Sequence, residues 1–180
     1  MSKEQFRMKS IIIKICERGL AIIAYIFPFV EISSTLALKV FLTADSQFLR
    51  FFYFTYISPV TDFYRANIYL CFAIMLGTFI ICAKGKIPFT NGKRKIPLTL
   101  YLRVNIIQAI LINVVSACIS ALYSDIPLAV QESSIGLIIA TGLYFWVLML
   151  ILSSIIVIIF GRYPKIPIIS EAARLQVQRY

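Results

Sequence analysis

Residues 103–113, with the sequence RVNIIQAILIN, open the hydrophobic segment around which the rest of this chain can be arranged. The 20 residues 104–123 measure about 30 Å as a helix, which is the thickness of the hydrocarbon layer of a bilayer. On a helical projection, five polar side chains of this segment fall within an arc of about 140°. They are Asn105, Gln108, Asn113, Ser116 and Ser120, here called the amide stripe. Polar groups at this depth need partners, so the stripe is expected to face other helices or a wet cavity rather than lipid.

The composition is typical of a membrane protein. Of the 180 residues, 60% are hydrophobic, compared with about 45–50% in soluble domains, and only 14% are charged. The net charge is +10 and histidine is absent, which excludes chemistry that depends on an imidazole base or ligand. Because the basic residues flank apolar runs, they favour membrane orientation over nucleic-acid binding.

Hydropathy predicts an all-α integral membrane protein with four transmembrane helices in a single membrane domain, residues 1–180. The predicted spans are about 17–37, 66–83, 104–123 and 135–160, followed by a basic tail, 161–180. The first span is expected to bend near Pro28, because proline lacks the N–H that a helix needs. A short surface helix is expected within residues 170–180.

An aromatic block, residues 48–64, separates the first and second spans. It concentrates eight Phe and Tyr side chains around Pro59. Aromatic rings with polar tips favour the membrane–water boundary, so one reading is an amphipathic, interfacial element. The other reading is a re-entrant element that lines a cavity.

The distribution of cations predicts the orientation. Segments 1–18, 84–103 and 161–180 carry fifteen Lys and Arg, whereas 31–65 and 124–134 carry three. With four spans, the three rich segments share one side, so the positive-inside rule places both termini on the cytoplasm-equivalent side. The basic loop (Lys84, Lys86, Lys93, Arg94 and Lys95) is expected to meet soluble partners or anionic lipid there. Arg103 is expected to be a snorkelling anchor at the start of its helix.

No catalytic constellation is present in the sequence, and no enzyme activity, cofactor or metal is expected. The seven glycines form no phosphate-binding loop, and no nucleophile lies near a base. The carboxylates Glu31 and Asp62 are expected to act as counter-ions for Arg65 or Lys39. The cysteines lack metal-ligand spacing and are expected to be small buried side chains; they are Cys16, Cys71, Cys82 and Cys118.

Two roles remain open for the amide stripe. As structural contacts, Asn105, Gln108 and Asn113 would hydrogen-bond across helices at about 0.6–2 kcal/mol each. As the lining of a hydrated path, the same side chains would offer donors and acceptors to a polar client without a fixed charge.

Two stretches resemble a known family. Residues 103–109 keep an Arg-aromatic-Asn-x-x-Gln-Ala pattern, except that Val104 replaces the aromatic residue, and residues 20–31 keep a Tyr-x-x-Pro run that ends in an acid. The order of aromatic block, span and basic turn is similar too. Over about residues 20–160, the chain resembles the 20-kDa component of the translocon at the inner envelope membrane of chloroplasts, including its plastid-encoded algal forms.

This resemblance implies a multipass subunit of the inner-envelope import machinery, with both termini in the stroma. It implies contacts with other inner- and outer-envelope translocon subunits, with preprotein in transit and with membrane lipid, and none with nucleic acid. Because four helices alone cannot enclose a wide pore, a larger assembly is expected. Two alternatives remain: a small homo-oligomeric solute carrier or channel, and a purely structural scaffold subunit.

Overall fold

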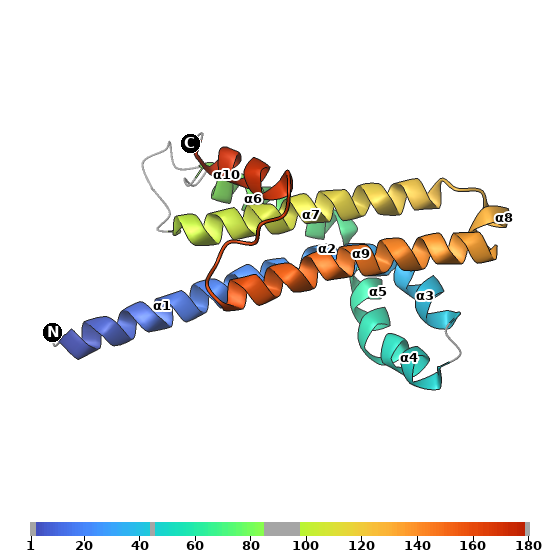
Figure 1. The fold of residues 1–180 in the computed structure, drawn as a ribbon, viewed down its shortest axis with the longest axis horizontal. Helices are drawn as coiled ribbons and strands as arrows, with labels where there is room; N and C mark the ends of the chain where they lie inside the picture. Colours follow the sequence, from blue (N-terminus) through green and yellow to red (C-terminus); the bar gives the residue numbers. More distant parts are fainter. Residues whose placement is uncertain (1–2, 44–45, 85–97, 179–180) are drawn as a thin grey trace.

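The structure, a computed structural model, describes residues 3–43, 46–84 and 98–178, and every regular element within these ranges is helical (Figure 1). The predicted all-α class is therefore confirmed for these residues. The α-helices are α1 (Lys3–Ala24), α2 (Ile26–Ile32), α3 (Leu38–Leu42), α4 (Gln47–Phe52), α5 (Ser58–Ala66), α6 (Ile68–Lys84), α7 (Leu100–Ser124), α8 (Leu128–Gln131), α9 (Ser134–Ile159) and α10 (Ile169–Gln178). Two π-helical turns are also present: η1 (Ser33–Ala37) joins α2 to α3, and η2 (Tyr53–Ile57) joins α4 to α5. The continuous run from α1 to α3 is here called the first helical segment.

Three helical segments are long and apolar enough to cross a bilayer: Ile12–Leu42, Leu100–Ser124 and Ser134–Ile159. Two further helical segments, Gln47–Ala66 and Ile68–Lys84, are long and apolar enough to cross a bilayer only if they are counted as one span. The angle between them is 83°. By length and composition the described chain thus has three spans, or four if the bent pair is one span.

The first segment is interrupted at Tyr25, three residues before the proline at which a bend was predicted. Tyr25 N bonds Ile22 O at 3.0 Å, and Pro28, inside α2, has no N–H to donate to the carbonyl of Ala24. The helix resumes in α2 and widens at η1, where Ser34 Oγ donates to Glu31 O at 2.8 Å.

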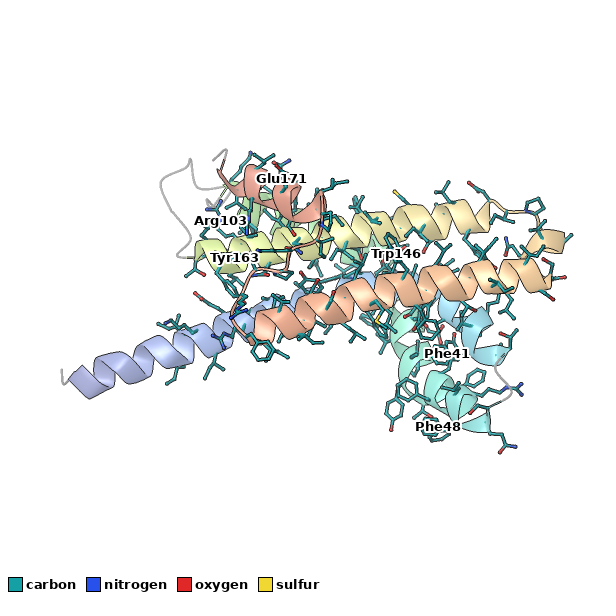
Figure 2. The ribbon with its side chains drawn as sticks, viewed as in Figure 1. Phe41, Phe48, Arg103, Trp146, Tyr163 and Glu171 are labelled. Carbon is teal, nitrogen blue, oxygen red and sulfur yellow. The ribbon has the colours of Figure 1, made fainter. Side chains whose placement is uncertain are left out.

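The helices α4 and α5, with η2 between them, form a lateral arm, residues 47–66, that carries the aromatic block (Figure 1). Most of its aromatic rings are exposed on the surface of the chain, but Tyr53 is buried. Its ring stacks on Phe41, which is labelled in Figure 2, at a centroid distance of 5.9 Å. Phe41 in turn meets the edge of Tyr144 on α9. These rings attach the inner side of the arm to the bundle.

Helix α7 lies at the centre of the bundle, in contact with α1, α2, α6, α9 and α10. It begins at Thr99, whose hydroxyl accepts a hydrogen bond from Leu102 N at 3.3 Å. Its residues Ala109 and Ile112 share a core with Ala21 and Tyr25 of the first segment. The helix predicted to organise the chain therefore contacts five other helices, while Val114, Cys118 and Leu122 remain exposed on its outer side.

The chain reverses at the end of α9 and returns across the bundle. Gly161 takes a left-handed conformation (φ 70°), and its N–H and that of Arg162 bond the last turn of α9. The predicted C-terminal surface helix is present as α10, and it packs on α6 and α7 through the buried residues Ala173 and Val177. In Figure 1, α10, the end of α6 and the start of α7 lie at one end of the bundle, here called the basic end.

The prediction for the cysteines was wrong for two of the four. Cys82 is buried and Cys71 half-buried, but Cys16 and Cys118 are exposed on the surface of the chain. Helices that face lipid are as apolar outside as inside, so hydropathy does not distinguish the two faces.

Candidate functional site

The amide stripe is buried inside the bundle. Asn105, Gln108 and Ser116 have no accessible surface, and Asn113 and Ser120 are nearly as enclosed. The stripe shares its side of α7 with Ala109 and Ile112, which pack against the first helical segment. The stripe therefore lies inside the bundle and not on its outer surface.

Few hydrogen bonds of the stripe cross between helices. Asn105 Nδ2 donates to Tyr101 O at 2.8 Å and Ser116 Oγ to Ile112 O at 2.9 Å, both within α7. Only Asn113 reaches another helix among the described residues, with Nδ2 at 3.1 Å from Met75 Sδ on α6. Both side-chain polar atoms of Gln108 lack a partner in the described part of the chain, as do Asn105 Oδ1, Asn113 Oδ1 and Ser120 Oγ.

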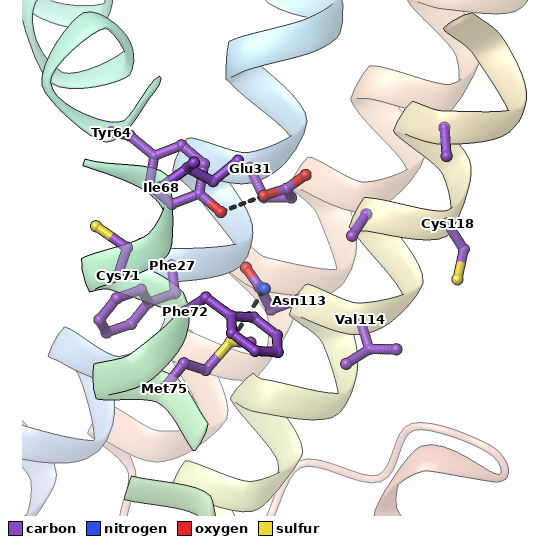
Figure 3. A pocket seen from close by; sticks show the side chains of 12 residues that line it. Phe27, Glu31, Tyr64, Ile68, Cys71, Phe72, Met75, Asn113, Val114 and Cys118 are labelled. Atoms are coloured by element: carbon purple, nitrogen blue, oxygen red, sulfur yellow. Dashed lines mark hydrogen bonds between the residues drawn. The ribbon is translucent and has the colours of Figure 1, made fainter. Parts of the chain in front are cut away.

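A lateral groove of about 450 Å³ opens beside Asn113 (Figure 3). Helix α2 forms one wall, α5 and α6 form a second and α7 forms the third. The lining is mostly apolar and includes Phe27, Phe72, Val114, Ala117, Cys118 and Ala121. Glu31, Tyr64 and Asn113 contribute its main polar groups, so the groove suits an apolar segment that carries a few hydrogen-bonding groups.

Glu31 lies in this groove and accepts a hydrogen bond from Tyr64 Oη (Figure 3). The neighbouring Arg65 donates through Nη2 to Ser34 O, in the π-helical turn η1. The widened turn frees backbone carbonyls, which explains why the cation is held there.

The predicted counter-ion pairs are absent from the described residues. Asp62 accepts from Ser58 Oγ at 3.0 Å, and Lys39 Nζ lies 5.6 Å from the centroid of the Tyr123 ring. The prediction was wrong because each charged group has a neutral partner. Glu31 accepts from the Tyr64 hydroxyl, Arg65 donates to a backbone carbonyl, and Lys39 lies over the face of an aromatic ring.

Arg103 holds the end of α6. Its Nε donates to Cys82 O and its Nη2 to Ala83 O, both at 2.6 Å. The last carbonyls of a helix have no partner within the helix and carry partial negative charge, so a guanidinium both satisfies and stabilises them. The predicted anchor therefore has a specific protein partner, which its sequence position did not reveal.

Of the basic loop, Lys84 is exposed at the end of α6. The remaining members, Lys86, Lys93, Arg94 and Lys95, lie outside the described residues.

Sequence reasoning missed the α5–α6 side of the groove, including Tyr64, Phe72 and Met75. The i, i+3, i+4 and i+7 spacing of Ile68, Cys71, Phe72 and Met75 marks one face of α6. This signal was hidden because α6 is apolar on every side.

Taken together, the apolar helices, the groove and the enclosed polar stripe define an α-helical membrane protein. The chain belongs to the family described as chloroplast import apparatus Tic20-like, whose model matches residues 13–173. This match begins in α1 and ends in α10, so it includes every helix that borders the groove.

Similar proteins occur in red algae under the name Tic20 family protein Ycf60. The one from Gracilaria tenuistipitata var. liui is 36% identical over 89 residues, which cover 49% of this chain and 44% of the relative. Those from Pyropia yezoensis and Porphyra purpurea are each 29% identical, over 69% and 68% of this chain. The aligned parts span about half of these relatives, namely 44%, 58% and 57% of their lengths.

Proposed function

We propose that this chain is a membrane subunit of the chloroplast inner-envelope protein import translocon and contributes to preprotein translocation into the stroma. The observation that carries the proposal is the family match over residues 13–173, which includes all the long apolar helices. Family membership and these helices support a plastid membrane protein. The proposed role is non-catalytic, and the partners would be other envelope translocon subunits, preprotein and lipid.

The proposed topology has four spans, with the bent pair counted as the second. The basic end would face the stroma, because Lys84 lies at the end of α6 and Arg162, Lys165 and Arg174 line a hollow beside α10, which packs on α6. Both termini would then be stromal, and the groove would open in the half of the membrane that faces the other way.

Within this topology, the amide stripe and the groove have different proposed roles. The burial of Asn105, Gln108, Ser116 and Ser120 supports a helix-contact role for them. Asn113 belongs to both features, since it also lines the groove. We assign the path or subunit contact to the groove, where a client segment would meet Glu31 and Asn113.

The first test is to extract the chain gently in detergent, purify it through a C-terminal tag and identify co-purifying proteins by mass spectrometry. A high-mass assembly with other envelope subunits and trapped preprotein is the expected result. A clean small homo-oligomer that mediates solute flux in proteoliposomes would overturn the proposal in favour of a carrier or channel.

The role of the groove is tested by site-specific photo-crosslinking at two adjacent positions of α7. Ala121 lines the groove, whereas Leu122 is exposed outside it. A photo-reactive residue at 121 is expected to capture translocon subunits or arrested preprotein, and Ala121→Trp is expected to slow import. The same changes at Leu122 serve as the control. Equal capture and equal import at both positions would identify the chain as a scaffold whose groove has no client.

A further inference from the structure

A second hollow, of about 720 Å³, lies at the basic end between α9 and α10. One wall is formed by Ser153 and Val157, one turn apart on α9, and by Gly161, just beyond the end of that helix. Its rim carries Arg162, Lys165 and Arg174. The hollow therefore joins an apolar helix face to three cations.

The cations are available to a ligand. Among the described residues, none of Arg162, Lys165 and Arg174 forms an ion pair, and all three side chains are exposed. The guanidinium carbon of Arg174 lies 5.4 Å from the centroid of the Tyr163 ring. The face of this ring therefore orients the guanidinium group. A guanidinium held in this way keeps its N–H donors free for an anionic oxygen group.

Tyr163 is itself firmly placed. Its ring packs against that of Tyr101 at a centroid distance of 5.4 Å, and Pro164, the next residue, is buried. Figure 2 shows Tyr163 beside α7, with Glu171 on α10. Glu171 lines an adjoining hollow together with Lys165 and Arg174, so the linings of the two hollows together contain three cations and one carboxylate.

A smaller hollow of about 220 Å³ shares Tyr163 and Arg174 with the first and is also lined by Leu100 and Val104 of α7. The two hollows thus share the Tyr163–Arg174 pair, and α9 borders one of them while the first turn of α7 borders the other. Their apolar walls belong to helices that are long enough to cross a bilayer.

We propose that this basic hollow binds the headgroup of an anionic diacyl lipid, with one acyl chain along Ser153 and Val157 and the other beside Leu100. Charge complementarity selects the headgroup, and a basic pocket next to spanning helices at a membrane surface is a known setting for such lipids. The two hollows select a two-chain lipid over a soluble phosphate. This site does not depend on the proposed role in import.

Native mass spectrometry of the full chain in detergent tests the charged part of the site, with phosphatidylglycerol as the probe and phosphatidylcholine as the neutral comparison. Lys165→Gln and Arg174→Gln are each expected to weaken phosphatidylglycerol binding about five-fold, as expected for one interfacial cation. Lys14→Gln, which removes an exposed cation of α1 outside the hollow, is the matched control. Lys165 is included because its replacement does not disturb the Arg174–Tyr163 contact.

The acyl part of the site is tested without a change of charge. Val157→Trp fills the hollow bordered by α9 and is expected to lower phosphatidylglycerol binding, whereas Ile156→Trp, on the exposed side of the same helix, is not. An excess of inorganic phosphate is expected to leave the bound lipid in place.

Three results would overturn the proposal. The first is equal lipid binding by Arg174→Gln, Lys165→Gln and the Lys14→Gln control. The second is equal binding of phosphatidylcholine. The third is displacement of the lipid by inorganic phosphate, which would identify a soluble anion site.

Discussion

At the scale of single residues, arginine side chains that bond backbone carbonyls of other helices are a recurring feature of this chain. Arg103 holds the end of α6, and Arg65 holds the π-helical turn η1. Arg18 of α1 donates from Nη1 to Ile159 O at 3.0 Å, at the last residue of α9. The Arg103 and Arg18 contacts supply a cation where helix dipoles place partial negative charge, whereas Arg65 bonds a carbonyl within a helical segment.

Arg103→Gln is expected to lower the free energy of unfolding by about 2 kcal/mol, because two hydrogen bonds from a charged group are lost. Arg103→Lys should recover only part of this loss, since an ammonium cannot reach two carbonyls as a fork does. Denaturant titration of the purified protein in detergent measures the change. Lys84→Gln, an exposed cation at the same helix end, is the control, and an equal effect there would contradict the specific contact.

Gln108 is fully enclosed and has no partner in the described part of the chain for either amide atom. Gln108→Leu is therefore expected to leave the free energy of unfolding of the isolated protein unchanged or to raise it by about 1–3 kcal/mol, the cost of an unsatisfied buried group. Gln108→Glu should destabilise strongly, because it adds a charge at the same enclosed position. A clear loss of stability in Gln108→Leu would show that the amide is already satisfied.

At the scale of elements, the contact between α8 and α9 depends on a missing side chain. A Cβ built on Gly136 would lie 2.2 Å from Val130 O and 2.7 Å from Gln131 O, in the turn that joins the two helices. Nearby, Tyr123 Oη bonds Gly136 O at 3.4 Å. The α8 turn can fold back onto α9 only because position 136 has no side chain.

Gly136→Ala is accordingly expected to destabilise the protein by about 1–3 kcal/mol, as overpacking does. Gly142→Ala, on the same helix, meets no atom within 4 Å and should be neutral or stabilising by up to about 1 kcal/mol from helix propensity. Thermal unfolding of the two variants in detergent provides the comparison. Similar melting temperatures would mean that the α8 turn moves aside at no cost.

Hydropathy was sufficient to predict helices at 104–123 and 135–160, because long uncharged runs have few alternatives. It did not predict the steep bend at Asn67, since a broken apolar segment resembles a straight one in composition. The hydrogen bond from Arg103 to Cys82 O could not be predicted from the sequence either. Every residue has a backbone carbonyl, and the sequence does not show which carbonyl lacks a partner within its helix. The groove depends on which side of the uniformly apolar α6 faces inward.

At the scale of the whole molecule, the number of membrane spans depends on whether the lateral arm and α6 together cross the bilayer. If the arm and α6 form one bent span, Thr43 and Glu132 lie on one side of the membrane, and Lys84 and Lys165 lie on the other. If they do not cross, Lys84 shares a side with Thr43. All four residues are exposed, so they can be labelled.

Single cysteines at these four positions, in a chain without its native cysteines, are expected to react with an impermeant maleimide in two pairs. In sealed vesicles of known orientation, Thr43→Cys and Glu132→Cys should label from one side, and Lys84→Cys and Lys165→Cys from the other. Labelling of Lys84→Cys together with Thr43→Cys would contradict four spans.

The arginine contacts also bear on how the protein is made. Arg103 follows Cys82 by 21 residues, so during synthesis the end of α6 stays unsatisfied until the start of α7 has emerged. The two helices are therefore expected to enter the bilayer as a hairpin rather than one after the other. The partner of Arg18, Ile159 O, lies 141 residues further along the chain, so this contact can form only after α9 has been synthesised. We therefore expect membrane insertion to be complete only when α9 has entered the bilayer.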